Sequence, residues 1–363
     1  MRFNDEHWAK KARVAIDMEL SILKAALVNS EGRLEVADLE MPKIGKTEML
    51  VKMRACGVCG TDLEKLQGVR VTPPVLGHEV VGDIEEVGAE VTGYSKGGRV
   101  AVHHHVSCGN CLYCRSGNQT MCPDFPKSNL DPCGFAEYFR VPEINVSKGA
   151  VFHIPASMDY EEAAFVEPAG CCIRALNKLE FRQGDNVLVI GAGPVGLTYI
   201  QLLQALGAGL IVATDLIESR LKWAERFGTD ATFNPARENS EKSILDVTQG
   251  RGFDKVLIAS GYSKAIQSSL GLVRKGGRIL LFGVPFEGSV LNWDASYMFI
   301  REISLIPSYS TTETEMKAAL EMMESGKIRL TSMITHRFNL REIAEAFRAA
   351  RDTASSLKVM VNG

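Results

Sequence analysis

Apolar and polar residues follow two different patterns along the chain. From Ile22 to about Val146, short runs with β character, such as GRVAVHHHV (98–106), are separated by glycine and proline. Runs of this kind are typical of strands joined by turns. From about Asp159 onward, helical patterns alternate with continuous apolar runs such as NVLVI (186–190), which suit buried parallel strands. The pattern therefore predicts a β-rich part followed by an α/β part.

The order of elements in the second part predicts a doubly wound parallel sheet, because strand and helix alternate regularly. A long helix at 160–179 precedes the first buried strand, and two helices and a final strand close the chain. The expected strands are 186–190, 210–214, 255–259, 278–282 and 357–361, and the later helices are 194–206, 218–227, 263–273, 313–325 and 340–351.

These patterns divide the chain into an extension and two domains. We expect an N-terminal extension at 1–20, a β-rich domain formed by 21–160 and 308–363, and a Rossmann domain at 161–307. The length of 363 residues agrees, because one hydrophobic core rarely serves so long a chain.

Composition and charge narrow the class of partner. The chain is 45% hydrophobic and 23% charged, with a net charge of −3, which gives no electrostatic reason to bind nucleic acid or a membrane surface. The first residues are charged and include Asp5 and Glu6, which argues against a secretory presequence. We expect a cytoplasmic protein whose partner is a small molecule.

Four of the nine cysteines fall in one C-x2-C-x2-C-x7-C run, at 108, 111, 114 and 122. Clustered cysteines in a reducing compartment more often hold metal than pair with each other. Four thiolates complete a tetrahedral Zn²⁺ shell and leave no position for substrate. The run predicts a structural zinc lobe at 107–123, held by Cys108, Cys111, Cys114 and Cys122. Cys56, Cys133, Cys171 and Cys172 are expected to be small packed residues.

A dinucleotide-binding fingerprint, GAGPVG (191–196), follows the strand at 186–190 and opens the next helix. In this motif glycines permit a tight turn, backbone approach to the pyrophosphate and close helix packing, and the helix N-terminus faces the phosphates. The predicted cofactor site comprises Gly191, Gly193, Pro194, Val195, Gly196, Asp215 and Arg220.

Asp215 ends the second strand of this unit and predicts NAD rather than NADP. A carboxylate there accepts hydrogen bonds from the ribose hydroxyls and repels a 2′-phosphate. Leu216 follows it, and no basic residue is close enough in sequence to replace the carboxylate. A plain role as helix N-cap stays open for Asp215.

A second group of donors, Cys59, His78, Glu79 and Glu167, has the N, O and S atoms of a catalytic zinc site. Spacing alone is weak evidence, because a single histidine on a β segment is more often structural.

The motifs together make the chain similar to the zinc-dependent medium-chain dehydrogenases/reductases over nearly its whole length. The resemblance is carried by GVCGTD (57–62), GHEVVGDIEEVGAEV (77–91), the four-cysteine lobe, VEP (166–168) and GAGPVG (191–196). It implies a GroES-like catalytic domain built from both chain ends, with the Rossmann domain inserted. It also implies association as a homodimer or homotetramer through the Rossmann sheet edge, for which the segment 297–309 has apolar β character.

The resemblance also implies the roles of individual residues. Catalytic zinc would be held by Cys59, His78 and Glu167, with Glu79 as an exchangeable ligand. Glu167 resembles the sorbitol and threonine dehydrogenase branch.

Two neighbours of Cys59 resemble residues with further roles. Thr61 resembles the hydroxyl that takes the alcohol proton, and Asp62 the carboxylate that orients His78. Both residues are also suited to beginning a helix. Glu64 stands where many relatives have a histidine that relays the proton outward.

The histidine triplet 103–105 has two possible roles. In a strand its side chains would alternate between faces, so that only His103 and His105 point together. His104 lies where the family's substrate pocket is lined, and is either a substrate contact or a polar strand residue.

The expected protein is an NAD-dependent enzyme with two Zn²⁺ per chain. It would act on a secondary alcohol or ketone of a polyol, sugar-like or amino-alcohol substrate. Two alternatives remain: a primary alcohol or aldehyde dehydrogenase of the same family, and a non-catalytic zinc and nucleotide binder.

Overall fold

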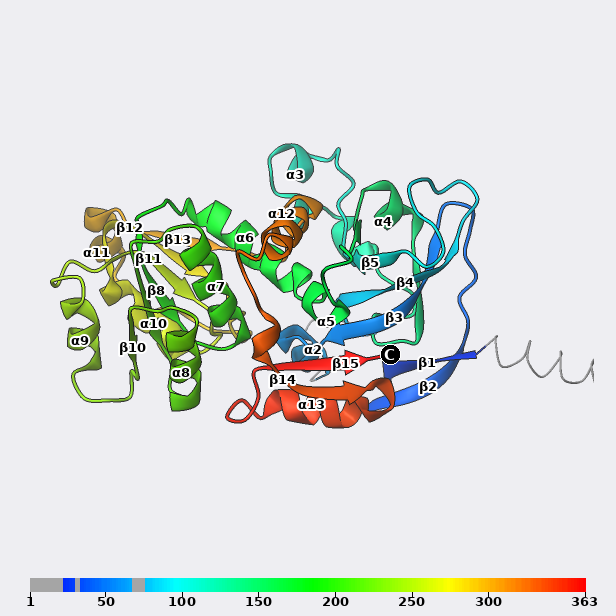
Figure 1. Cartoon of the computed structure of the whole chain (residues 1–363). Coiled ribbons are helices and arrows are strands. Elements are labelled where there is room, and N and C mark those ends of the chain that lie inside the picture. Colours follow the sequence, from blue (N-terminus) through cyan, green and yellow to red (C-terminus); the bar gives the residue numbers. More distant parts are fainter. Residues whose placement is uncertain (1–21, 30–32, 67–75) are drawn as a thin grey trace, which may run out of the picture. The chain divides into compact units, whose positions relative to one another are not determined.

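The computed structural model describes residues 22–29, 33–66 and 76–363, so the predicted extension at 1–20 lies outside the described residues. Two compact units are present (Figure 1). The first unit combines the chain up to Phe165 with Ile334–Gly363, and the second unit is Val166–Met333. Within the described ranges, no helix is long and apolar enough to cross a membrane.

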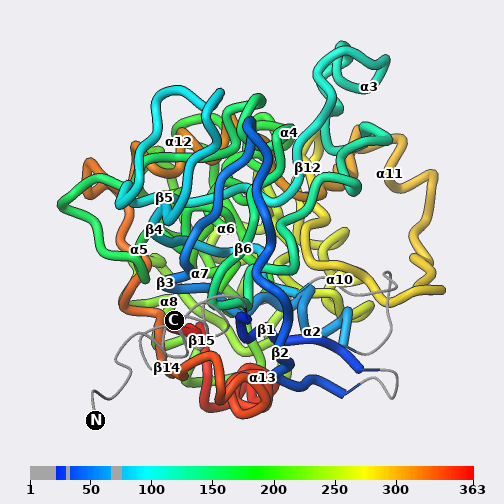
Figure 2. Tube along the Cα trace, turned by 90° about the vertical axis from the view of Figure 1, so that its right-hand side faces the viewer, coloured from blue at the N-terminus to red at the C-terminus, as the bar shows by residue number. Residues whose placement is uncertain are grey.

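The first unit is built on a β-sheet to which both ends of the chain contribute. Its strand order is β14-β15-β3-β4-β5-β7, and β6 pairs with β3 beside this path. A separate antiparallel hairpin of β1 and β2 lies next to α13, although these elements come from opposite ends of the chain (Figure 2). The strands are β1 Ile22–Val28, β2 Leu34–Glu40, β3 Met49–Gly57, β4 Glu79–Val87, β5 Arg99–Val102, β6 Tyr138–Val141, β7 Val151–His153, β14 Ile334–Asn339 and β15 Lys358–Asn362, and the helices include α2 Gly60–Leu66, α3 Leu112–Arg115, α4 Glu143–Ser147, α5 Tyr160–Ala163 and α13 Ile343–Arg351.

Apolar side chains from alternate positions of these strands form the core of the first unit. Val51 and Met53 of β3, Phe139 of β6 and Val361 of β15 are all inaccessible to solvent. Strand β15 pairs antiparallel with β3, so that Met360 lies opposite Gly57. The last strand of the chain is therefore fixed beside the end of β3, directly before Cys59.

The second unit is the predicted doubly wound α/β domain. Its six strands are all parallel, in the order β10-β9-β8-β11-β12-β13, which is the 3-2-1-4-5-6 order of the Rossmann fold. Connecting helices pack on the sheet, α7 against β8 and β9 and α10 against β11 and β12. The strands are β8 Asn186–Ile190, β9 Leu210–Thr214, β10 Ala231–Phe233, β11 Phe253–Ile258, β12 Val273–Leu281 and β13 Ser304–Pro307, and the helices are α6 Val166–Leu179, α7 Pro194–Ala205, α8 Glu218–Arg226, α9 Ser240–Asp246, α10 Ser263–Leu272, α11 Ala295–Arg301 and α12 Glu313–Glu324.

The chain returns to the first unit later than the sequence pattern indicates, at Ile334 instead of residue 308. The reason is that α12 packs along α6. A Cβ atom at Gly170 of α6 would lie 3.1 Å from Cγ of Met316, so glycine permits this close helix contact. The segment 308–333 therefore belongs to the second unit.

Two other expectations differ from the structure. The helix predicted at 160–179 is two helices, α5 and α6, divided near Ala164. The segment 297–309, for which β character was expected, holds the end of α11 and the short edge strand β13. Short elements such as β10 and α9 were not predicted, because three to seven residues carry too little periodicity.

Candidate zinc and cofactor sites

Strand pairing in the first unit brings Cys59 and His78 together. Cys59 directly precedes α2 and follows the end of β3, while His78 directly precedes β4. Strands β3 and β4 are antiparallel, with Gly57 opposite Glu79. As a result, ligand atoms of Cys59, His78 and Glu79 all lie within 4.8 Å of one another.

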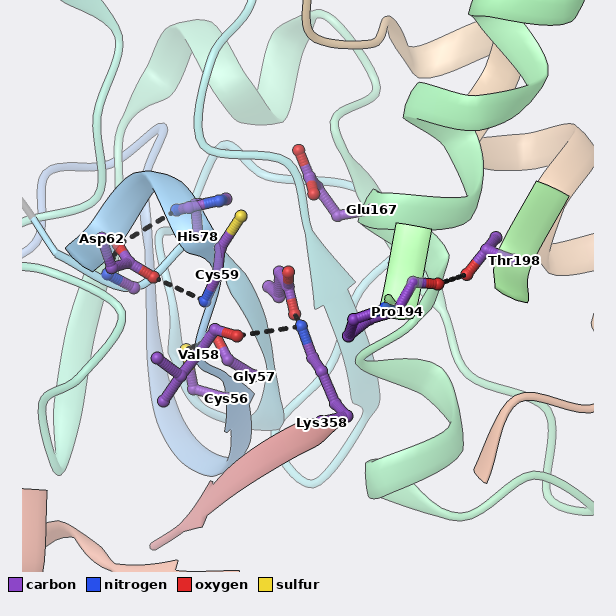
Figure 3. Close-up of polar contacts among 12 residues, drawn as sticks. Cys56, Gly57, Val58, Cys59, Asp62, His78, Glu167, Pro194, Thr198 and Lys358 are labelled. Atoms are coloured by element: carbon purple, nitrogen blue, oxygen red, sulfur yellow. Dashed lines mark hydrogen bonds and ion pairs between the residues drawn. The ribbon is translucent and has the colours of Figure 1, made fainter. Parts of the chain in front are cut away.

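Asp62 organises this group from the first turn of α2. Its side chain is fully buried and accepts hydrogen bonds from the backbone N–H groups of Cys59 and Gly77, both at 3.0 Å. Its Oδ1 also lies 3.3 Å from Nδ1 of His78 (Figure 3). The ring of His78 is thereby held with Nε2 as the nitrogen left for a metal, as metal-binding histidines require. Asp62 thus contacts the His78 ring, as predicted for an orienting residue, and also accepts a backbone hydrogen bond at the start of α2.

The charges of Asp62 and His78 stabilise each other. Burial alone would lower the pKa of His78, but Asp62 and Cys59 raise the pKa well above its ordinary value. Burial alone would raise the pKa of Asp62, and the His78 imidazole reverses this and lowers the pKa. Thr61 is also next to His78: its hydroxyl oxygen Oγ1 lies 3.4 Å from Nε2 of the imidazole ring.

Glu79 has a partner that sequence reasoning missed, Lys358 at the start of β15. The two side chains form an ion pair and are almost wholly buried. The Lys358 ammonium also donates to the carbonyl of Val58 at 3.1 Å (Figure 3). Burial would lower the pKa of Lys358, but Glu79 and Cys59 raise it. Gly57 leaves room for this ion pair, because a Cβ atom at this position would displace the Glu79 carboxylate and the Lys358 side chain.

Glu167 belongs to the second unit, in the first turn of α6 (Figure 3). Its side chain is 7% exposed, and its Oε1 accepts a hydrogen bond from the thiol of Cys171 at 3.4 Å. Cys171 was expected to be an inert packed residue, but it is only partly buried and contacts this carboxylate. Cys56, Cys133 and Cys172 are buried, as expected.

The four cysteines of the predicted lobe converge around α3, which projects from the first unit in both views (Figures 1 and 2). Their sulfur atoms lie within 4.8 Å of one another, with Cys111 at 3.5 Å from Cys114. Hydrogen bonds from the backbone of Asn110 and Cys111 lower the pKa of Cys108 to about 6. The lowered pKa favours the thiolate, the form that binds metal.

The GAGPVG segment forms the turn between β8 and α7 that the fingerprint predicts. Gly191 has a φ of +99°, which favours glycine, and a Cβ atom at Gly196 would collide with the Gly191 carbonyl. Gly193 is the N-cap of α7, and Pro194 and Val195 open the helix. Proline suits the first helical turn because its missing N–H would have no partner there.

Asp215 closes this turn from the end of β9. Its two carboxylate oxygens accept hydrogen bonds from the backbone N–H groups of Ala192 at 2.8 Å and Ile217 at 2.9 Å. Ile217, and not Asp215, is the N-cap of α8. Arg220 lies close by, with Nη1 at 3.9 Å from Asp215. A basic residue therefore lies near Asp215 in space.

The histidine triplet lies outside the strand in which it was expected. Strand β5 ends at Val102, so the predicted alternation of faces does not apply. The rings of His104 and His105 are 3.9 Å apart, and the His104 ring is 5.1 Å from that of His78. Burial lowers the pKa of His104 well below its ordinary value and that of His105 to about 4. Both rings are therefore neutral at physiological pH.

Comparison with known proteins agrees with these two units. Residues 45–155 match the family model of the alcohol dehydrogenase GroES-like domain, and residues 194–325 match that of the zinc-binding dehydrogenases. The chain is 32% identical to sorbitol dehydrogenase of Bacillus subtilis (strain 168), over 93% of this chain and 97% of that protein. It is also 32% identical to L-threonine 3-dehydrogenase of Pseudoalteromonas atlantica, over 93% and 98% of the two chains.

A solved structure shows the same fold. A zinc-binding dehydrogenase from Sinorhizobium meliloti 1021, crystallised with NADP, superposes with a TM-score of 0.87 at 29% identity, covering 94% of this chain and 100% of that one. The two family models, the sequence identities and the shared fold agree with one another. The chain therefore belongs to the zinc-dependent medium-chain dehydrogenase/reductase family, in its sorbitol and threonine dehydrogenase branch, and is an oxidoreductase that transfers hydride between a nicotinamide cofactor and an alcohol or ketone.

Proposed function

We propose that the chain oxidises a secondary alcohol of a polyol, sugar-like or amino-alcohol substrate with NAD, at a zinc held by Cys59, His78 and Glu167. The observation that carries the proposal is the position of the buried Asp62 carboxylate. It accepts a hydrogen bond from the backbone N–H of Cys59 and contacts Nδ1 of His78. Sorbitol and threonine, after which the relatives are named, both have secondary alcohols.

The donor set fits a catalytic zinc. Thiolate, imidazole and carboxylate are the ligands that Zn²⁺ takes, and three protein ligands leave one position for substrate. A bound zinc supplies Lewis acidity, which lowers the pKa of an alcohol and polarises a ketone. Cys59 and His78 hold the metal, and Asp62 keeps the His78 ring in the tautomer that presents Nε2.

We infer that Glu167, and not Glu79, is the third resting ligand. The Glu79 carboxylate is neutralised by Lys358, and binding a metal would pull it from this buried ion pair. In its contact with Cys171, Glu167 accepts a hydrogen bond from a thiol, which is a weak donor. Glu79 then serves as the exchangeable ligand.

Thr61 is the first residue on the proposed path of the proton. Its hydroxyl oxygen lies 3.4 Å from Nε2 of His78, and we infer that it relays the alcohol proton toward solvent, accepting that proton as it releases its own. Beyond it, Glu64 of α2 replaces the histidine of many relatives.

NAD is the proposed cofactor because Asp215 retains acceptor capacity for ribose hydroxyls. Each oxygen accepts one backbone hydrogen bond, and an ionised carboxylate has about four acceptor positions. Its negative charge opposes a 2′-phosphate, although Arg220 lies 3.9 Å away and the Sinorhizobium relative was crystallised with NADP. The kcat/KM values with NAD and NADP test this choice, and a strong preference for NADP would contradict it.

Substrate profiling distinguishes the proposed function from its alternatives. The zinc-loaded protein is assayed by NADH absorbance with sorbitol, threonine, simple secondary alcohols and primary alcohols. We expect activity with secondary alcohols; activity confined to primary alcohols would identify the other type of dehydrogenase. Absence of turnover together with one zinc per chain, confined to the lobe, would indicate a non-catalytic binder.

We further propose a homodimer or homotetramer formed through β13, the edge strand of the second unit's sheet. Phe299 and Ile300 of the neighbouring α11 are 81% and 69% exposed, and Tyr309 is also exposed. An unpaired edge with apolar neighbours is a surface that another chain can cover. We also propose a cytoplasmic location, where the nine cysteines stay reduced.

A further inference from the structure

One face of α6 carries a row of polar side chains beginning at Glu167. Cys171 lies one turn further on and Arg174 about two turns, and residues at this spacing share a helix face. The Cys171 thiol donates to Oε1 of Glu167 at 3.4 Å, and Glu167 is 7% exposed. A carboxylate that must bind a metal is therefore already contacted through one of its two oxygens.

The neighbouring thiol, Cys172, points elsewhere although it is next in sequence. It is fully buried, and burial raises its pKa. The two adjacent cysteines thus have different environments. Cys172 belongs to the packing between α6 and α7, and Cys171 to the polar face of Glu167.

We propose that Cys171 is a positioning residue for the catalytic zinc site. Its thiol holds the Glu167 carboxylate through Oε1 and leaves Oε2 available to a metal. The inference rests on the proposed role of Glu167 as a zinc ligand. Hydrogen-bonded partners of metal ligands contribute roughly 10–100-fold to metal affinity or activity. Because a thiol is a weak donor, we expect an effect near the lower limit, about 10-fold.

The experiment compares Cys171→Ala, Cys171→Ser and Cys172→Ala in the full-length protein. Zinc affinity of the catalytic site is measured by competition with a chelator, and the absorption spectrum is recorded after Co²⁺ replaces this zinc. Cys171→Ala should weaken zinc binding about 10-fold and shift the Co²⁺ spectrum. Cys171→Ser retains a donor and should stay close to wild type. Cys172→Ala, the matched control, should lower thermal stability without changing zinc affinity.

Two results would overturn the inference: unchanged zinc affinity in Cys171→Ala, or an equal loss in Cys171→Ala and Cys172→Ala. Glu167→Ala separates this inference from the proposed function. If Glu167→Ala loses the catalytic zinc while Cys171→Ala keeps wild-type affinity, only the role of Cys171 is wrong. If Glu167→Ala itself keeps wild-type affinity, the proposed ligand set is wrong.

Discussion

Lys358 and Glu79 form an ion pair in the interior of the first unit, with side chains 5% and 1% exposed. They are far apart in sequence, and the pairing of β15 with β3 brings them together. The Lys358 ammonium thus balances the charge of the buried carboxylate next to His78.

Replacing Lys358 with methionine should destabilise the protein by about 3–5 kcal/mol, because the buried Glu79 carboxylate loses its counter-charge. Urea unfolding of the metal-loaded protein measures this. The control is Lys96→Met, which removes an exposed lysine paired with Glu85 and should leave the unfolding midpoint unchanged. An equally small effect in both variants would show that the Lys358 pair contributes no more than a surface contact.

The Asp62–His78 pair predicts a pH dependence of stability in the metal-free protein. The pKa of His78 is raised from 6.5. Its contribution to the free energy of unfolding is therefore complete below pH 6.5 and is lost as the pH rises through the raised pKa. The pKa of Asp62 is lowered from 3.8. Its contribution to the free energy of unfolding is therefore complete above pH 3.8 and is lost as the pH falls through the lowered pKa. The pair therefore contributes most between about pH 4 and 6.5.

Asp62→Asn tests this dependence. The loss in the free energy of unfolding, relative to wild type, should be larger at pH 5.5 than at pH 9. A loss that does not vary with pH would mean that Asp62 acts only through its hydrogen bonds to the Cys59 and Gly77 backbone.

The sequence predicts best those features in which a short motif determines its own geometry. The four-cysteine run and GAGPVG both fold as expected, because ligand spacing and glycine requirements are local. Lys358 could not be found this way, since its partner depends on the pairing of β15 with β3. The available signal was a lysine that begins a short apolar strand, where a charge needs a buried partner.

Other differences between prediction and structure also have identifiable causes. The histidine triplet was assigned to a strand because it follows three apolar-strand residues, but the ladder with β4 ends at Val102. The return of the chain to the first unit was expected at 308 because no motif marks the packing of α12 on α6. In the sequence, Cys171 could not be distinguished from a small packed residue, because only the structure shows its contact with Glu167.

Asp215→Asn should reduce kcat/KM for NAD about 10-fold or more and raise the relative use of NADP, because the charge that repels a 2′-phosphate is removed. Steady-state kinetics with both cofactors measure the ratio. Asp230→Asn is the control, since Asp230 also accepts a backbone N–H, that of Ile211 on β9. If both variants change the ratio equally, Asp215 does not select the cofactor.

Cys111→Ser should reduce the zinc content from about two ions to about one per chain, because a closed site needs all four thiolates. Elemental analysis of the purified protein gives the count. Cys133→Ala removes a buried cysteine from the core of the first unit and should retain both ions. Two zinc ions in Cys111→Ser would mean that the lobe does not bind metal through Cys111.

The most direct test of the proposed reaction site is the zinc content and turnover of Cys59→Ala, measured beside wild type with NAD and a secondary alcohol. We predict one zinc per chain, retained by the lobe, with NADH formation abolished and NAD binding nearly unchanged. If Cys59→Ala keeps two zinc ions and continues to form NADH, the catalytic metal is not at Cys59 and the proposed site is wrong.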